Sequence, residues 1–185
     1  MKKELQELIK GDMVRYYGKE SLSIKEKLTK PLQVKYMITY RKAAFYTKKS
    51  PSGIYYRLRL KRLSEKSGIQ IPTKTKIGKG FFIGHFGPII INPEVLIGEN
   101  VNIASGVTIG KTNRGSKMGV PKIGNRVWIG TNAVIVGNIT IGDDVLIAPN
   151  AYVNTDVPSH SIVLGNPGVI HPRELATEGY INRTV

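Results

Sequence analysis

The chain has 185 residues, with 28 Lys and Arg against 13 Asp and Glu, and a formal net charge of +15. It has no cysteine, which excludes disulfides, thiolate metal ligands and a cysteine nucleophile. No run approaches the roughly 18 apolar residues of a membrane span, and the first residues lack the apolar segment of a secretory signal, so a cytoplasmic location is predicted.

The positive charge is concentrated in the N-terminal third of the chain. Eighteen Lys and Arg and six Asp and Glu precede Ile69, a net of +12, and the remaining residues carry a net of +3. Such a basic extension predicts an anionic neighbour: an anionic membrane face, phosphorylated sugars or the phosphates of a cofactor. Nucleic acid is not an expected partner, because no recognition motif accompanies the charge.

Residues 1–68 are predicted to form a basic region of short helices. Ser23 and Glu26 have the spacing of a capping box, which marks a helix N-terminus. Asp12 is a candidate N-cap for a turn that ends at Gly18. The region is therefore expected to consist of several helices with turns between them.

The last part of this region is predicted from its glycines and proline. Residues 51–53 (Pro-Ser-Gly) are expected to interrupt the helices. Residues 54–66 are expected to form a basic helix closed by Gly68. Because Leu58 and Leu60 alternate with arginines, a short strand is the alternative there.

A six-residue repeat dominates the rest of the chain. A period of six fits neither a helix nor an ordinary strand, and it predicts a parallel β-helix in which each hexapeptide supplies one strand and one corner. Stacked coils would bury the repeated aliphatic side chains together. The alternative is an antiparallel sandwich, but its strands would not keep a fixed six-residue spacing. The repeated positions are Ile71, Ile77, Ile83, Ile97, Ile103, Ile109, Ile123, Ile129, Ile135, Ile141, Ile147 and Val153, and a smaller apolar residue stands two places before most of them.

Two segments interrupt the repeat. The first, residues 84–91, contains His85, and the phase slips just after it. The second is a polar, glycine-rich loop, residues 111–121, that is too long for a corner, and such loops often carry function. We therefore expect a β-helix domain over residues 69–170 with a protruding loop, followed by a mobile tail over 171–185. Asp143 and Asp144 are expected to form a solvated corner pair.

The repeat resembles the hexapeptide-repeat acyltransferases. Within that family it is most similar to serine O-acetyltransferases and to the relatives that acetylate capsular and surface polysaccharides. Three segments carry this resemblance: Gly84-His85-Phe86-Gly87-Pro88, Pro121-Lys122-Ile123-Gly124 and Gly165-Asn166-Pro167. The resemblance implies a left-handed parallel β-helix, a homotrimer with sites between subunits, and acetyl-CoA as co-substrate.

The same resemblance implies that His85 is the catalytic residue. An alcohol needs a base to take its proton as it attacks a thioester, and neutral imidazole has a suitable pKa. The imidazolium can then protonate the leaving thiolate, so no acyl-enzyme is required. Backbone N–H groups near Gly110 and Lys111 are candidate donors to the developing oxyanion.

The acceptor is predicted from departures from the serine acetyltransferase pattern. Those enzymes carry aspartates where this chain has Gln70 and Gly84, and an Arg-His pair, which helps hold the substrate carboxylate, where it has Gly119 and Val120. Gln70 can accept a hydrogen bond from the histidine but offers no charge. A desolvated carboxylate needs charged donors, so a saccharide hydroxyl is the predicted acceptor and serine the alternative.

The CoA-binding positions also follow from the resemblance. Thr131, Pro149 and Asn154 match positions that bind the pantetheine arm. Lys111, Lys122 and Arg126, together with Lys117, are candidates for the CoA phosphates because cations suit them.

Two other classes of function fit the sequence less well. Zinc hydratases with this fold need three histidines around one metal, and the chain has three in all, two of them beyond the regular repeat. No metal is therefore expected. A scaffold without catalytic activity is the remaining alternative. For the basic N-terminal region two interpretations stay open: peripheral contact with an anionic membrane at its inner face, or a solvated basic face whose tyrosines pack on the prism.

Overall fold

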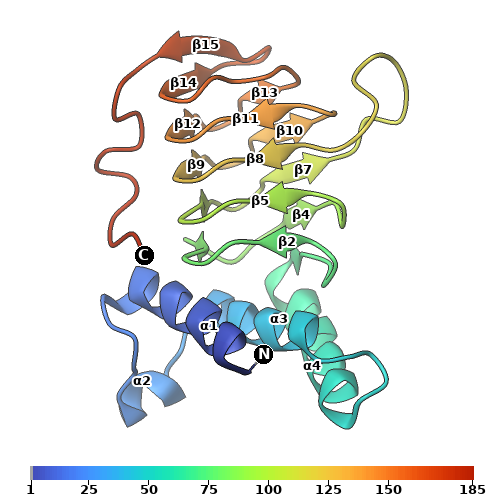
Figure 1. Ribbon diagram of the computed structural model, residues 1–185, viewed down its shortest axis with the longest axis vertical. Coiled ribbons are helices and arrows are strands. Elements are labelled where there is room, and N and C mark those ends of the chain that lie inside the picture. Colours follow the sequence, from blue (N-terminus) through green and yellow to red (C-terminus); the bar gives the residue numbers. More distant parts are fainter. Residues whose placement is uncertain (1) are drawn as a thin grey trace.

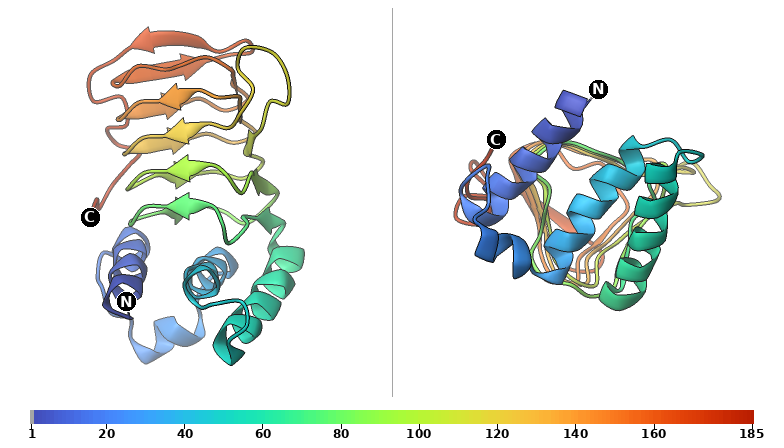
Figure 2. Two further views of the ribbon diagram at one scale, coloured as in Figure 1. Left: turned by 45° about the vertical axis from the view of Figure 1, so that its right-hand side comes forward. Right: turned by 90° about the horizontal axis from the view of Figure 1, so that it is seen from below.

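The computed structural model describes residues 2–185, apart from the side chain of Lys27. Met1, the first residue of the predicted N-terminal region, lies outside the described residues. The chain folds into a layer of helices and a three-sided column of short strands, the prism, that stands on it (Figures 1 and 2). None of the described helices is long and apolar enough to cross a bilayer.

The helices confirm the capping box and correct two other predictions. Ser23 and Glu26 cap the second helix reciprocally. Asp12 is not a cap, because it lies inside a continuous first helix and is buried. Residues 51–53 do not interrupt the helices: Ser50 caps a helix that starts at Pro51, which rules out a strand near Leu58. The helices are α1 (Lys2–Tyr17), α2 (Ile24–Leu28), α3 (Leu32–Phe45) and α4 (Pro51–Ser67).

The strands form three sheets, one on each side of the prism. Neighbouring strands are parallel except for the last pair, in which β15 runs antiparallel to β14. The first sheet contains β1 (Ile69–Gln70), β4 (Ile89–Ile91), β7 (Thr108–Gly110), β10 (Val134–Val136) and β13 (Tyr152–Val153). The second contains β2 (Lys76–Ile77), β5 (Leu96–Ile97), β8 (Lys122–Ile123) and β11 (Thr140–Ile141). The third contains β3 (Phe82–Ile83), β6 (Asn102–Ile103), β9 (Val127–Ile129), β12 (Val145–Ile147), β14 (Ser161–Leu164) and β15 (Val169–Pro172).

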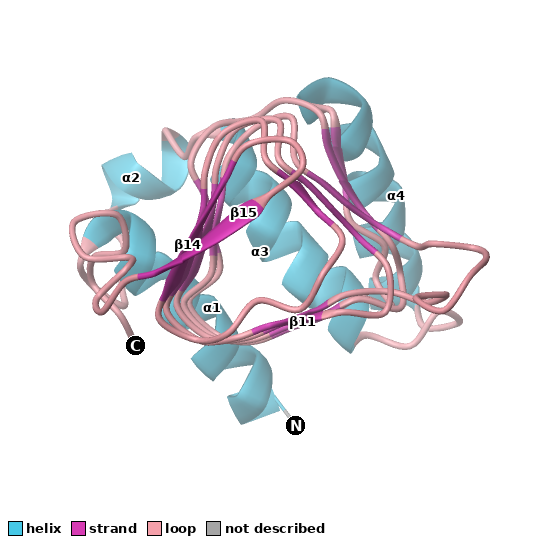
Figure 3. Cartoon of the chain, turned by 90° about the horizontal axis from the view of Figure 1, so that it is seen from above, coloured by secondary structure: helices cyan, strands magenta, loops and turns pink. Residues whose placement is uncertain are grey.

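The six-residue repeat builds the core of the prism. Every repeated aliphatic position is buried, and so are the smaller apolar residues two places before them. Seen along the axis, successive coils superpose (Figure 3), and the buried side chains lie inside them. Alternate strand residues share a face, so the intervening residues point outward. The predicted parallel β-helix is confirmed.

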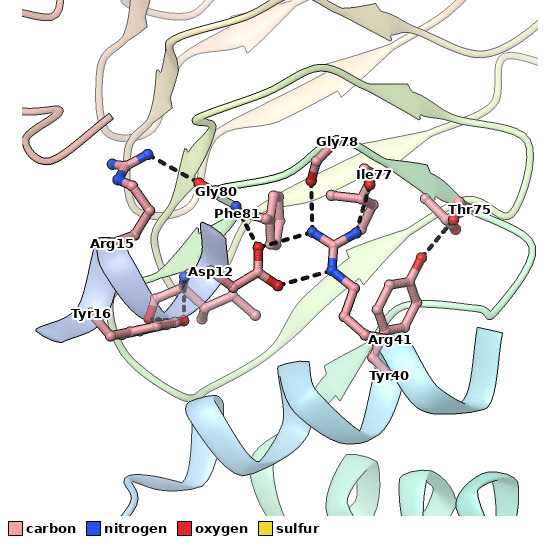
Figure 4. A network of polar contacts seen from close by, with 11 residues as sticks. Asp12, Arg15, Tyr16, Tyr40, Arg41, Thr75, Ile77, Gly78, Gly80 and Phe81 are labelled. Carbon is pink, nitrogen blue, oxygen red and sulfur yellow. Dashed lines mark hydrogen bonds and ion pairs between the residues drawn. The ribbon is translucent and has the colours of Figure 1, made fainter. Parts of the chain in front are cut away.

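A buried ion pair joins the helices to the prism. The Arg41 guanidinium of α3 binds both carboxylate oxygens of Asp12 in α1, at 2.8 and 3.0 Å. Arg41 also donates to the carbonyls of Ile77 and Gly78 at 2.6 Å, and the Phe81 N–H donates to Asp12 (Figure 4). Because both charges are fully paired inside the protein, this network fixes α1 and α3 on the first coil.

The C-terminal segment beyond β15, which was expected to be mobile, is packed on the protein. It runs back along the third sheet to α1 (Figure 1). The Tyr180 ring packs on Trp128 with centroids 4.9 Å apart, and the Asn102 side chain donates to the Tyr180 carbonyl. Asn100 exchanges two 2.9 Å hydrogen bonds with the backbone of Val185. The tail therefore covers the outer face of the third sheet.

Asp144 anchors the start of this tail and is not solvated as predicted. Its carboxylate is buried and accepts hydrogen bonds from the Ala176 N–H and from the N–H and hydroxyl of Thr177. The Nδ1 atom of His160 lies 2.9 Å from the same carboxylate. Burial opposes ionisation of Asp144, but the hydrogen bonds from Thr177, His160 and Ala176 outweigh it and lower the pKa of the carboxyl.

Candidate active site

His85 lies on an exposed corner of the first coil. The corner, residues 84–88, connects β3 of the third sheet to β4 of the first sheet. The buried side chains of Ile83 and Ile89 hold its two ends in the core, while His85 and Phe86 are exposed. An imidazole on a surface corner is accessible to a substrate, as a general base must be.

Two helices fix the position of this corner. The Gly87 N–H donates to the Ser67 carbonyl at the end of α4, at 2.8 Å, and the Gln33 side chain of α3 donates to the Gly84 carbonyl at 3.2 Å. Gly68 has φ +75°, and a Cβ there would lie 3.0 Å from the Gly87 carbonyl carbon. The end of α4 therefore approaches the histidine corner backbone to backbone, which requires glycine.

Gln70 lies on the strand next to this corner but is not bonded to the histidine. It is exposed in β1 and pairs with Ile90 of β4. Within residues 2–185 no hydrogen bond to the His85 ring is present, so the contact suggested by the sequence is not made in this structure. The orienting partner of a general base often engages only when substrate is bound.

Two of the predicted CoA positions stack above His85. The corners between the third and first sheets of successive coils contain His85, Ser105, Thr131 and Pro149, and we call this line the histidine edge. Backbone hydrogen bonds connect successive corners along this edge. The Asn132 N–H donates to the Ser105 carbonyl, and the Asn150 N–H donates to the Thr131 carbonyl. His85 and Pro149 are three coil steps apart, about 14 Å at the usual strand spacing.

Gly110, Lys111 and Asn154 lie on a different edge, between the first and second sheets. The protruding loop leaves the prism there. Two backbone hydrogen bonds between Thr112 and Gly119 hold the two ends of the loop together. Lys117 in this loop donates to the Asn154 carbonyl at 2.8 Å, and Lys111 lies 3.5 Å from Glu94. We call this the loop edge. Within one chain, the first sheet separates it from the histidine edge.

The two remaining cations lie elsewhere. Lys122 points outward from the second sheet, and Arg126 lies on the third edge of the prism with φ +50°. One chain therefore does not bring the predicted site residues together. Among the described residues, no group of three His, Asp or Glu side chains could hold a metal ion.

Comparison with known proteins identifies the repeat. Residues 121–155 match the family described as bacterial transferase hexapeptide (six repeats). Serine acetyltransferase 2 of Arabidopsis thaliana is 41% identical over 106 residues, which are 57% of this chain and 33% of that protein. The chain thus spans a third of the length of this relative.

Solved structures agree with this relationship. The soybean serine acetyltransferase apoenzyme superposes with a TM-score of 0.75 at 27% identity, covering 90% of this chain and 69% of that one. A serine acetyltransferase in complex with CoA gives 0.71 at 25% identity, covering 90% and 68%. These neighbours have the left-handed β-helix fold, which confirms the predicted fold class. Residues 121–155 therefore match the hexapeptide repeat of bacterial transferases, and the relatives named above are serine acetyltransferases.

The predicted saccharide acceptor, and with it a role in polysaccharide biosynthesis, is wrong. The relatives and structural neighbours are serine acetyltransferases, which favours the alternative. The prediction relied on Gly119 and Val120, and both positions seat the loop on the prism. A Cβ on Gly119 would lie 2.8 Å from that of Asn138, and Val120 packs against the core. Gly119 and Val120 therefore have a structural role in this chain, which is to hold the loop against the prism.

Proposed function

We propose that the protein transfers an acetyl group from acetyl-CoA to the hydroxyl of L-serine, with His85 as general base. The observation that carries this proposal is the 41% identity to a serine acetyltransferase over 106 residues, which are 57% of this chain. The exposure of His85 on a corner held by two helices supports it.

In the proposed reaction the neutral imidazole of His85 removes the serine hydroxyl proton as the oxygen attacks the thioester carbonyl carbon. The tetrahedral intermediate carries an oxyanion, which backbone N–H groups can stabilise. Its collapse breaks the carbon–sulfur bond, and the imidazolium protonates the departing thiolate. The products are O-acetylserine and CoA, and His85 returns to its neutral form.

The serine carboxylate needs a cation in place of the family's arginine and histidine. The protruding loop carries three cations, of which Lys111 and Lys117 are already engaged with Glu94 and Asn154. Arg114 is exposed at the centre of the loop, and a guanidinium can bind a carboxylate through two parallel hydrogen bonds. We therefore assign carboxylate binding to Arg114.

We further propose a homotrimer, with sites between copies. The second sheet presents Lys76 and Lys122 to solvent, and the tail covers the third sheet. The outer face of the first sheet is largely apolar, and none of the described residues covers it. Its outward side chains include Ile90, Val134, Val136 and Tyr152.

Copies that meet through this face would place the loop edge of one copy beside the histidine edge of the next. Lys111 and Asn154 would then join Thr131 and Pro149 around acetyl-CoA, with Lys122 and Arg126 as candidates for its phosphates.

Release of CoA thiol from acetyl-CoA in the presence of L-serine tests the activity. His85→Ala should lower kcat about a hundredfold or more, while His171→Ala, on exposed β15, should leave it unchanged. Absence of serine-dependent release from the native protein would overturn the proposal.

Sedimentation velocity tests the assembly. Ile90→Arg should give monomers without turnover, because a buried charge opposes association. A native monomer with full turnover would contradict the trimer.

A further inference from the structure

The end of the helical layer farthest from β15 exposes two pairs of aliphatic side chains. On α2, Ile24 and Leu28 are 77% and 75% exposed, and on α4, Ile54 and Leu58 are 50% and 59% exposed. Each pair is spaced four residues apart, so its members lie on one face of their helix. Figure 1 and the left view of Figure 2 place α2 and the start of α4 at this end. Apolar side chains that gather at one end of a surface are a common feature of sites that bind a protein or a membrane.

A hollow lined with cations lies beside these pairs. It has a volume of about 250 Å³ and is bounded by α3, by the start of α4 and by the segment that follows α2. No acidic residue lines it. Its lining includes Lys30, Lys35, Lys42, Tyr55, Tyr56 and Arg59.

Two cations of the hollow, Lys42 and Arg59, contact tyrosines. Lys42 lies 5.1 Å from the centre of the Tyr56 ring, and Arg59 donates to the Tyr55 hydroxyl at 3.1 Å. Glu26, the acidic residue of α2, forms an ion pair with Lys19 at 2.9 Å, and its carboxylate accepts hydrogen bonds from the N–H and hydroxyl of Ser23. Within the described residues, neither Lys42 nor Arg59 forms an ion pair, so the positive charge of both is not compensated by a carboxylate.

We propose that this end of the helical layer binds an anionic phospholipid surface. The aliphatic pairs would enter the boundary between headgroups and acyl chains, and the hollow would receive a lipid phosphate. Interfacial helices bind in this way, through apolar burial combined with attraction between cations and anionic lipids. Nucleic acid would leave the aliphatic pairs without a role. A second copy docked here would bring two strongly basic ends together, which like-charge repulsion opposes.

Co-sedimentation of the full chain with vesicles tests this proposal. One set contains phosphatidylcholine alone, and in the other about a third of the lipid is phosphatidylglycerol. The native protein should bind the anionic vesicles, lose that binding in high salt, and remain unbound with phosphatidylcholine. The double variant Ile24→Ser with Leu28→Ser should weaken binding about tenfold. The double variant Lys35→Gln with Arg59→Gln should weaken binding by a similar factor or more, because each cation near the membrane raises the affinity about fivefold.

Matched variants on the prism provide the controls. Leu96→Ser and Lys74→Gln with Lys76→Gln remove an exposed apolar side chain and two exposed cations from residues outside the helical layer. They should bind vesicles as the native chain does. Equal binding by all variants, or no binding to anionic vesicles, would overturn the proposal. So would a concentration-dependent assembly that Ile24→Ser with Leu28→Ser abolishes, because the occupant would then be a second copy.

Discussion

Gly68 and Gly87 meet where α4 ends against the histidine corner, so close that a Cβ on Gly68 would lie 3.0 Å from the Gly87 carbonyl carbon. This contact connects the last turn of a helix to the residues that follow His85 in the corner. A change at Gly68 should therefore affect both stability and catalysis.

Gly68→Ala should destabilise the protein and lower kcat more than it changes KM. The left-handed φ costs an alanine about 1–2 kcal/mol, and the new Cβ pushes the corner away from its position. Gly179→Ala is a matched control, because Gly179 has φ +77° and nothing within 4 Å of an added Cβ. Thermal unfolding and steady-state kinetics separate the two effects. Equal losses of kcat in both variants would show that the contact does not position His85.

Asp144→Asn should release the C-terminal tail. The charge-assisted hydrogen bonds from Thr177 and His160 would be lost or weakened, so hydrogen exchange at the Ala176 and Thr177 amides should accelerate. Glu178→Gln, an exposed position in the same tail, should not change it. Unchanged exchange in Asp144→Asn would mean that other contacts hold the tail.

The same carboxyl gives the tail a defined pH dependence. Because its pKa in the folded state lies below the usual 3.8, the stabilising contribution of Asp144 is complete above that value and is lost as the pH falls through the lower one. Protection of the Ala176 and Thr177 amides should therefore hold from neutral pH down to about 4 and decline in stronger acid. In Asp144→Asn, that decline should be absent.

Asp12→Ala should lower the free energy of unfolding by about 3–5 kcal/mol, because it leaves the Arg41 charge buried without its carboxylate. Chemical denaturation measures this loss. Removal of the exposed Lys10–Glu20 pair by Lys10→Gln should leave the denaturation midpoint unchanged. If both variants behaved alike, the buried network would not be what holds α1 and α3 on the prism.

Arg114→Gln should raise the KM for serine about tenfold, the expected effect of losing hydrogen bonds to a charged group. The KM for acetyl-CoA and the fold should remain unchanged. Arg173→Gln removes an exposed arginine from the tail and serves as the control. A normal serine KM in Arg114→Gln would transfer the assignment to another cation.

The prism could be predicted from the sequence because its signal is local and repeated. Each hexapeptide places its own aliphatic residue in the core, so Ile97 or Ile141 can be assigned from neighbours six positions away. Asp12 and Arg41 could not be paired in this way. Their partnership depends on how two helices cross the first coil, and a single Asp in a helical pattern looks like a cap or a surface residue. Asp144 was likewise interpreted as solvated because its partners come from the tail.

The arrangement of the candidate site residues in space could not be predicted from the sequence. His85, Thr131 and Pro149 do share an edge, while Lys111 and Asn154 lie on another edge of the same chain. The acceptor was predicted wrongly because substitutions at Gly119 and Val120 were interpreted as a change of substrate. The close approach of the Gly119 backbone to Asn138 cannot be recognised in a single sequence, because its only sign there is the glycine itself.

The returning tail also determines how the prism can come apart. A solenoid whose coils contact only their neighbours can lose its last coil while the rest remains folded. Here Asp144, Trp128, Asn102 and Asn100 bind the tail at successive levels, and Arg15 of α1 donates to the Asn182 carbonyl at 2.9 Å. The outermost coil and the helical base are thus joined through one segment, so fraying at either end disturbs the other. Despite its repetitive core, the protein should melt in a single cooperative transition.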